Sequence, residues 1–391
     1  MSRDKTILDL GAGIGAIPVV RQTMVNIVLK DDNFKLVLVA PNTHFHWPIS
    51  MPRTIVPVQH LEDKTFIPLT PTFSDYPPQK FSFVRGKAVS LDPESNSVTV
   101  GLAAGGSLSV PYHTLIIAIG ARARARGGMP WKCLSDTLET RERLYHLQDQ
   151  IAKAKSIVVA GGGLTAVEIA GELGYKYSQH GTKEVILVYN DRLPLAPPAT
   201  DSVRSQVKLE LERLKVKLIS DTTVTSHGSH DGTITLQLKN AEGSVESIST
   251  EAYLPAFGLI PNTDFMPEHL LDDRKYIKQT TKLQVEGHSN IFVIGDAGSL
   301  ESSNAIHADK QAVHLIKALP SYFAKCELAE YRADSRPAFG IALGPSRGVG
   351  QVGNWRVYSI LVWFMKGRYL GTDYSPMLAT GKRTSMTIFE K

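Results

Sequence analysis

The sequence has few cysteines and no long hydrophobic run. Its 391 residues include two cysteines, Cys133 and Cys326, and no Cys-x-x-Cys pair, which excludes a redox-active disulfide of that type. The longest apolar run, at 357–365, is well short of the ~20 residues that a helix needs to cross a bilayer. Because the thiols are isolated and no signal-peptide pattern is seen, we expect a cytoplasmic protein without a transmembrane segment.

The charge is nearly balanced, with 43 Lys and Arg residues, 38 Asp and Glu residues and a net charge of +5. These charges are interspersed, so we expect no nucleic-acid partner. One short basic run, Arg122, Arg124 and Arg126, is either a solvated linker or a contact to a cofactor phosphate. No group of His, Cys, Asp and Glu has the spacing of metal ligands, so we expect no metal site.

Two glycine-rich turns are the strongest motifs. They occupy 11–16 (Gly-Ala-Gly-Ile-Gly-Ala) and 161–166 (Gly-Gly-Gly-Leu-Thr-Ala), each between an apolar run typical of a buried parallel strand and a segment of helical periodicity. In the pattern G-x-G-x-x-G/A, the glycines allow a tight turn and a close approach of pyrophosphate to the helix N-terminus, and the last position must be small for packing. The duplication predicts an α/β protein with two Rossmann-like dinucleotide-binding domains.

A different function is compatible with the first turn alone. Asp9, Gly11, Gly13 and Gly15 also fit the D-x-G-x-G-x-G loop of S-adenosylmethionine methyltransferases. That alternative leaves the second turn unexplained, and it also leaves unexplained the apolar strand that ends in Gly-Asp at 295–296. We therefore favour the dinucleotide-binding interpretation.

Several further segments resemble, in the same order, one family of flavoproteins. They are 41–47 (Pro-Asn-Thr-His-Phe-His-Trp), 52–57 (Pro-Arg-Thr-Ile-Val-Pro), 112–120, 160–174, 257–263 and 294–296. Together with the two turns, they are similar to the fungal branch of the apoptosis-inducing factor / ferroptosis suppressor-like NAD(P)H:quinone oxidoreductases, which are FAD-dependent and have the glutathione-reductase-type fold. The resemblance covers nearly the whole chain.

The resemblance implies that the second dinucleotide-binding domain is inserted in the first. A discontinuous FAD-binding domain would comprise 1–125 and 264–335, an NAD(P)-binding domain 126–263, and a small α+β C-terminal interface domain 336–391. FAD and, in the inserted domain, NAD(P)H would be the cofactors. A homodimer would be one use of the C-terminal domain.

The resemblance also implies roles for individual residues. Those that would hold FAD are Gly11, Gly13 and Ala16 at the pyrophosphate, Asn42 at the adenosine ribose, Arg53 near the flavin or the phosphates, Gly120 at the turn between domains, and Asp296 at the ribityl or phosphate region. Those that would hold the nicotinamide cofactor's pyrophosphate are Gly161, Gly163 and Ala166. Candidate catalytic residues are Glu168, near the nicotinamide, and His307 and Lys310, which would polarise the flavin or the acceptor.

Simpler roles remain open for some of these side chains. Asp296 is alternatively a cap of the following loop, and Glu168 a solvated carboxylate favoured by a helix N-terminus. His44 and His46, which alternate in one loop, are either structural or an acid/base pair at the flavin edge.

The chain departs from the family pattern at several positions. Asp9 stands where a hydrophobic residue is usual, and a buried carboxyl should be paired or neutralised. Asn42 replaces the acidic residue that holds the adenosine ribose, while Ile119 and Leu164 replace a threonine and a proline. After the second strand of the inserted domain, Asp191 favours NAD and the adjacent Arg192 favours NADP.

These motifs predict a two-step electron transfer. Hydride would pass from NAD(P)H to the flavin, and electrons would then pass to a small and conceivably lipophilic acceptor such as a quinone. The departures from the pattern motivate two alternatives. The first is a flavoenzyme of specialised-metabolite biosynthesis with a degenerate cofactor site, and the second is a non-catalytic nucleotide-binding module. The apolar stretch 355–370, flanked by Lys366 and Arg368, predicts packing, dimerisation or a peripheral contact with a lipid surface.

Overall fold

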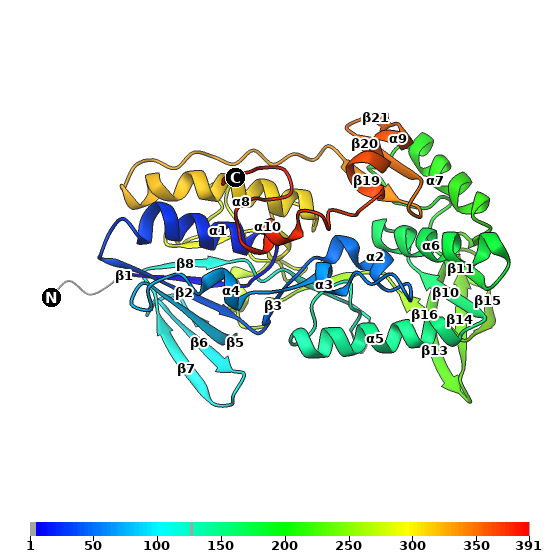
Figure 1. Cartoon of the computed structure of the whole chain (residues 1–391), viewed down its shortest axis with the longest axis horizontal. Helices are drawn as coiled ribbons and strands as arrows, with labels where there is room; N and C mark the ends of the chain where they lie inside the picture. The colour runs from blue at the N-terminus through cyan, green and yellow to red at the C-terminus, as the bar shows by residue number, and fades with distance from the viewer. Residues whose placement is uncertain (1–4, 126–127, 391) are drawn as a thin grey trace.

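A computed structural model describes residues 5–125 and 128–390 as two α/β units with a C-terminal segment against both (Figure 1). The first unit is built on a seven-stranded sheet in the order β18-β8-β1-β2-β5-β6-β7. Its first five strands in this order are parallel, and β5, β6 and β7 form an antiparallel meander. The strands are β1 Lys5–Leu10, β2 Phe34–Ala40, β5 Phe81–Asp92, β6 Ser97–Leu102, β7 Ser107–Pro111, β8 Thr114–Ile117 and β18 Ile291–Val293.

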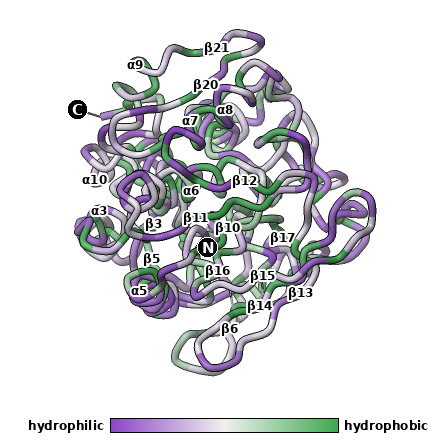
Figure 2. The backbone as a smooth tube through the Cα atoms, turned by 90° about the vertical axis from the view of Figure 1, so that its right-hand side faces the viewer, coloured by the Kyte–Doolittle hydropathy of each residue, from purple (hydrophilic) through white to green (hydrophobic). Residues whose placement is uncertain are grey.

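The second unit has a four-stranded parallel sheet in the order β12-β11-β10-β16 and a three-stranded antiparallel sheet of β13, β14 and β15. Apolar side chains of both sheets meet in one cluster, so the antiparallel sheet covers one face of the parallel sheet. The strands are β10 Ser156–Ala160, β11 Glu184–Val188, β12 Lys217–Ile219, β13 Thr222–His230, β14 Thr233–Asn240, β15 Val245–Thr250 and β16 Ala252–Pro255. Figure 2 shows hydrophobic residues along β10 and β11 and a largely hydrophilic outer helix α5 (Thr137–Lys153).

The second unit is inserted in the first. The chain leaves the first sheet after β8 and returns to it at β18, and the two crossings, β9 (Ala121–Ala123) and β17 (Leu259–Pro261), pair antiparallel. This arrangement confirms the predicted fold class of two Rossmann-like domains, one within the other.

Helices complete the layers in the places that the sequence pattern predicts. On the first sheet lie α1 (Ala16–Thr23), continued by the π-helix η1 (Met24–Val28), and α8 (Ala305–Phe323); their apolar side chains join those of the strands in one core. On the second lie α5, α6 (Leu164–Lys176) and α7 (Asp201–Arg213). Helix α5 starts with an N-cap, because Asp136 accepts from the Glu139 backbone N–H, and Glu139 accepts from the backbone N–H of Ser135 just before the cap.

The remaining elements join the two units. The C-terminal segment has an antiparallel sheet of β19 to β21 whose strands contact α6 and α7, and a short helix α10 that contacts α1. Its elements are β19 Ala338–Ala342, β20 Gly348–Val352, β21 Trp355–Val357, α9 Ser359–Val362, the π-helix η6 Trp363–Gly367 and α10 Ser375–Ala379. Between β2 and β5 lie β3 His44–His46, η2 Pro48–Ser50, α2 Met51–Thr54, α3 Glu62–Thr65, β4 Phe66–Pro68 and α4 Thr70–Phe73. Within the described ranges, no helix combines the length and the apolarity needed to traverse a membrane.

Candidate cofactor site

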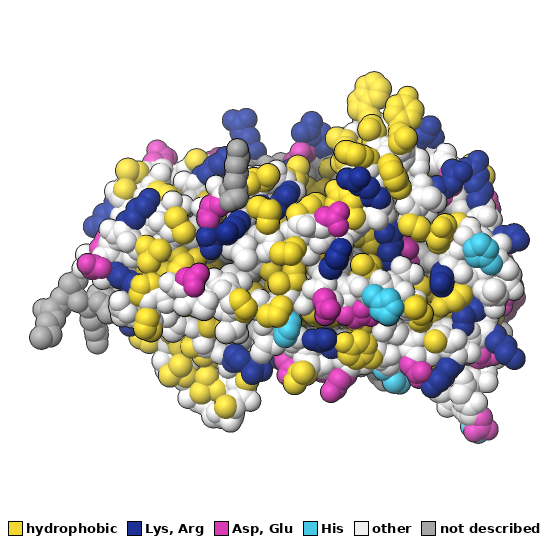
Figure 3. Space-filling view, viewed as in Figure 1, with side chains coloured by type: hydrophobic (Ala, Val, Ile, Leu, Met, Phe, Trp, Pro, Cys, Tyr) yellow, Lys and Arg dark blue, Asp and Glu magenta, His cyan; other side chains and the backbone are white. Residues whose placement is uncertain are grey.

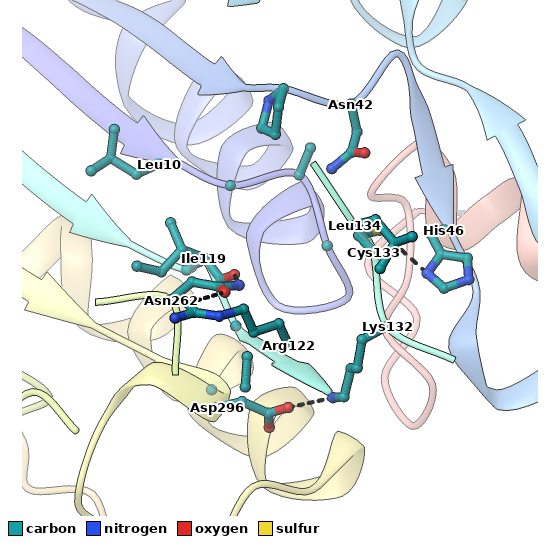
Figure 4. A pocket seen from close by; sticks show the side chains of 18 of the residues that line it. Leu10, Asn42, His46, Ile119, Arg122, Lys132, Cys133, Leu134, Asn262 and Asp296 are labelled. Carbon is teal, nitrogen blue, oxygen red and sulfur yellow. Dashed lines mark hydrogen bonds and ion pairs between the residues drawn. The ribbon is translucent and has the colours of Figure 1, made fainter. Parts of the chain in front are cut away.

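A cavity of about 760 Å³ opens where the parallel strands of the first sheet end. Its walls come from the turns after β1, β2, β8 and β18 and from the segment 132–135, which leads into α5 (Figure 4). Ligands of open α/β sheets bind at this carboxyl edge. The cavity therefore lies where the duplicated turns predict a dinucleotide.

Gly11 and Gly161 occupy equivalent positions in the two units. Gly11 has φ +117° and donates its N–H to the Val39 carbonyl at 2.9 Å; Gly161 has φ +133° and donates to the Val188 carbonyl at 2.8 Å. A Cβ on Gly11 would lie 2.4 Å from the carbonyl oxygen of Ala118, just after β8. A Cβ on Gly161 would lie 2.6 Å from that of Ala256, just after β16. Only glycine fits such a position, and so the duplication in the sequence is also a duplication in structure.

The next residues of the first turn leave the space that a phosphate needs. Gly13 lines the cavity, and a Cβ there would meet no atom of the chain within 4 Å. Ala16 is fully buried at the start of α1, which has no acidic residue in its first turn. The N-terminal backbone N–H groups of α1 are therefore open to an anion at Gly13.

Asn42 follows β2 and points into the cavity (Figure 4). Its Oδ1 is buried and has no hydrogen-bond partner in the described part of the chain. A buried acceptor without a donor is unfavourable by itself, and a ribose hydroxyl can supply that donor. Asn42 thus provides a neutral contact where an acidic residue is usual.

Asp296 and Lys132 form an ion pair across the cavity. Asp296 lies in the turn η5 (Gly295–Ala297) after β18, and its Oδ2 is 2.6 Å from Lys132 Nζ (Figure 4). Asp296 is therefore not merely a loop cap. No local pattern points to Lys132, because its partner lies 164 residues away.

Part of the basic run is brought to the same cavity. Arg122 and Arg124 both line it, and Arg126 is outside the described residues. Arg122 Nη1 lies 3.1 Å from Asp264 and donates to Asn262 Oδ1 at 3.2 Å, while Asn262 Nδ2 donates to the Ile119 carbonyl. Arg122 and Lys132 are each paired with a carboxylate that also lines the cavity, whereas Arg124 has no ion-pair partner among the described residues. Arg124 is thus the cation that is available to a dinucleotide's pyrophosphate.

Gly120 forms the turn between β8 and β9 with φ +65°, and its carbonyl accepts the Asn262 N–H at 3.1 Å. This turn joins the two crossings between the units next to the cavity, which Gly120 lines. The structure thus places Gly11, Gly13, Asn42, Gly120 and Asp296 around one space.

His46 and Cys133 lie at the end of the cavity toward α5. Cys133 Sγ is 3.3 Å from His46 Nδ1 (Figure 4). Burial, with the nearby Lys132 cation, lowers the pKa of His46 to about 3, and burial raises the pKa of the Cys133 thiol to about 12. Both groups are therefore neutral at physiological pH, and the pair lacks the thiolate that redox thiol chemistry requires.

Arg53 lies away from this cavity, in a junction between the two units. From α2 its guanidinium forms two hydrogen bonds, of 3.0 and 2.8 Å, with the carboxylate of Glu172 on α6, and donates to the Gly367 carbonyl in η6 at 2.8 Å. Both side chains of the pair are almost fully buried. Its guanidinium is thus occupied by the protein, because two carboxylate oxygens and a carbonyl already surround it.

Glu168 lies one turn before Glu172 on α6. Its Oε1 accepts from Lys366 Nζ at 2.5 Å and from the Ala342 backbone N–H at 2.9 Å. It is buried, so it is not a solvated carboxylate. Lys366, which also donates to the Gly340 carbonyl at 2.9 Å, is a second cation that sequence reasoning did not connect to a site.

His307 and Lys310 do not line the cavity. His307 Nδ1 lies 2.8 Å from the Ser302 carbonyl, and Lys310 Nζ lies 3.4 Å from Asp334. They are on faces of α8 other than the one that presents Ala305 and Ala308 to the cavity. The helical period explains this difference, since Ala305 and Ala308 are three residues apart.

The second turn is intact but leaves the choice of nucleotide open. Ala166 is fully buried under the turn. Beyond β11, Asp191 is held by Arg204 at 2.8 Å and Arg192 by Asp201 at 2.8 Å. Both Asp191 and Arg192 are thus already paired within the protein. Neither is a free group that would select the ribose hydroxyl of NAD or the 2′-phosphate of NADP.

A sequence profile described as "Pyridine nucleotide-disulphide oxidoreductase" matches residues 8–312, most of the chain. The chain belongs to this family. Among the relatives of this pyridine nucleotide-disulphide oxidoreductase, Oxidoreductase ptaL of Pestalotiopsis fici is 31% identical over 92% of the chain and 94% of the relative. Ferroptosis suppressor protein 1 of Mus musculus is 28% identical over 93% of each. The predicted resemblance is therefore confirmed, and the chain is an oxidoreductase.

Solved structures agree with the fold. The structure of NDH2 from Plasmodium falciparum in complex with NADH superposes with a TM-score of 0.74 at 13% identity, over 97% of this chain and 98% of that one. FAD and a nicotinamide nucleotide are the cofactors of this oxidoreductase family, as predicted. The open cradle at Gly13, the unpaired Oδ1 of Asn42 and the Arg124 cation on the cavity wall fit the first of them.

Proposed function

We propose that this oxidoreductase takes electrons from NAD(P)H through FAD to a small organic acceptor such as a quinone. The observation that carries the proposal is the pair of equivalent cradles at Gly11 and Gly161, one of which opens on a cavity large enough for a dinucleotide. The resemblance to NAD(P)H:quinone oxidoreductases supports the acceptor class. The two free thiols, Cys133 and Cys326, are consistent with a cytoplasmic setting.

The residues of the cavity would bind and orient FAD. The N–H of Gly13 and the first N–H groups of α1 would face the pyrophosphate, Asn42 would face the adenosine ribose, and Asp296 and Lys132 would face the ribityl chain. A bound flavin supplies the hydride and electron chemistry. The chain then needs no nucleophile, and the neutral His46–Cys133 pair serves to close the cavity end.

Glu168 is the candidate residue for the nicotinamide side. Its Oε1 accepts both hydrogen bonds, and its Oε2 has no partner among the residues described here. A free carboxylate oxygen can accept a hydrogen bond from the carboxamide of a nicotinamide. Lys366 would then act as a positioning residue, because it holds the other oxygen.

Anaerobic titration of the purified protein with NADH and with NADPH tests the proposal. The visible absorbance of oxidised flavin should fall with at least one of the two and return when a short-chain quinone is added. A yellow protein that neither nucleotide bleaches would contradict the nicotinamide half-reaction and favour a flavoenzyme of specialised metabolism. Bleaching that no quinone reverses would contradict the acceptor class.

Gly13→Val should separate flavin binding from folding. A Cβ added at Gly13 meets nothing within 4 Å and opens into the cavity, so the melting temperature of the apoprotein should stay within a few degrees of wild type. The same atoms would occupy the pyrophosphate position, so we expect FAD affinity to fall by about a hundredfold or more. Gly228→Val is the matched control, because a Cβ at this exposed position of β13 also meets nothing within 4 Å and the backbone there does not have a positive φ. Equal flavin affinity in Gly13→Val and wild type would refute the assignment of the cradle.

A further inference from the structure

The C-terminal segment carries an apolar ridge that no other part of the described chain covers. The ridge consists of Val352, Trp355, Tyr358, Ile360, Leu361, Phe364 and Met365, all exposed. Trp355, Tyr358 and Ile360 are 82, 72 and 70% exposed. Figure 3 shows hydrophobic side chains that project beyond the surface over β21 and α9. Contiguous exposed apolar residues of this kind mark an interaction surface.

Val362, the buried residue of α9, anchors the ridge on the sheet beneath it. Val362 is buried, and a Cβ added at Gly340, Gly348 or Gly350 would lie 3.3, 2.5 or 2.9 Å from its methyl groups. These glycines leave the space that Val362 fills, so α9 is anchored on β19 and β20. The other apolar side chains of the ridge therefore point outward from a helix whose position is set by packing on β19 and β20.

The charge of the segment identifies the partner. Residues 337–372 contain no Asp or Glu and four cations, Arg347, Arg356, Lys366 and Arg368. Lys366 is bound to Glu168 and Arg347 lies 3.6 Å from Glu210, whereas Arg368 lies over the rings of Phe364 and Tyr369. Arg356 contacts only the uncharged Gln206. Among the described residues, neither Arg356 nor Arg368 has a carboxylate partner, so the ridge carries two unpaired cations.

We propose that the ridge inserts into the surface of an anionic phospholipid bilayer. Tryptophan and tyrosine at the tip, aliphatic side chains beside them and arginines at the base are the composition of segments that lie in a membrane interface. A second copy fits less well, because in a symmetric contact the same segment of the other copy would offer these arginines no carboxylate. The proposal is independent of the flavin and of the acceptor.

Vesicle sedimentation of the full-length protein tests the proposal. Vesicles of phosphatidylcholine with added phosphatidylserine should bind the protein, and should bind it more weakly as salt is raised, while vesicles of phosphatidylcholine alone should bind less. Brominated acyl chains should quench tryptophan fluorescence, since Trp355 is exposed while Trp47 and Trp131 are buried. Trp355→Ala should reduce that quenching.

Ile360→Glu should lower vesicle binding by about tenfold or more, because it removes an apolar contact and adds a negative charge. Val245→Glu is the matched control, since Val245 is equally apolar and exposed but lies on β15, and it should bind as wild type does. Wild-type protein that ignores both kinds of vesicle would overturn the proposal. A dimer that Ile360→Glu dissociates, without vesicle binding, would overturn it in favour of self-association.

Discussion

Arg53→Ala should lower the free energy of unfolding by about 3–5 kcal/mol, the usual cost of removing one partner of a buried ion pair. The change leaves Glu172 buried without its two hydrogen bonds from Arg53, and leaves the Gly367 carbonyl without its donor. Burial already raises the pKa of Glu172, and the hydrogen bonds from Arg53 oppose that rise. Urea denaturation at neutral pH measures the loss.

A surface ion pair provides the control for Arg53→Ala. Lys153 and Asp149 are more than half exposed at 2.6 Å on α5, so Lys153→Ala should change stability by only about 0.5 kcal/mol. The double variant Arg53→Met with Glu172→Leu should recover part of the loss, because it removes both buried charges. If Arg53→Ala lowers the free energy of unfolding no more than Lys153→Ala does, the buried ion pair between Arg53 and Glu172 does not stabilise the junction.

Asp9→Val should raise the free energy of unfolding at neutral pH by about 1–3 kcal/mol, because an unpaired polar group is removed from the core. Asp9 is fully buried in the middle of β1 between Leu38 and Ile116, and neither carboxyl oxygen has a hydrogen-bond partner among the described residues. Thermal unfolding at neutral pH checks the gain. Among the departures from the family pattern, Asp9 has the clearest physical consequence.

The pH dependence of stability tests the state of the Asp9 carboxyl. Burial raises the pKa of Asp9 well above the usual value. Of the two states expected for a buried carboxyl, paired or neutral, Asp9 is therefore in the neutral one. Above about pH 4 the unfolded chain loses this proton and the folded chain keeps it, so stability falls with rising pH by at most about 1.4 kcal/mol per unit until the folded pKa is reached. Asp9→Asn, an isosteric change, should lack this slope. If the free energy of unfolding depends on pH in the same way in wild type and in Asp9→Asn, Asp9 is not protonated in the folded protein.

The architecture could be predicted because its signals are local. The turns at Gly11 and Gly161 need glycine for backbone reasons that act within a few residues, and the apolar runs before them fit buried parallel strands. The resemblance to the flavoprotein family implied the insertion of one unit in the other. Asn42, Gly120 and Asp296 could be placed for the same reason, since each follows a strand end.

The ion pairs could not be predicted, because both partners depend on the tertiary fold. Lys132 meets Asp296, Arg53 meets Glu172 and Lys366 meets Glu168 over separations of 164, 119 and 198 residues. No periodicity or spacing links such pairs. His307 and Lys310 were placed near the flavin by the resemblance alone, and the helix instead presents Ala305 and Ala308 there.

The flavin content of the purified protein tests the central claim, that the cavity beside Gly11 and Gly13 holds FAD. Heat denaturation should release one FAD per chain from wild type, or from wild type reconstituted with FAD, and far less from Gly13→Val. A folded wild-type protein that contains no flavin and takes none up when FAD is added would contradict it.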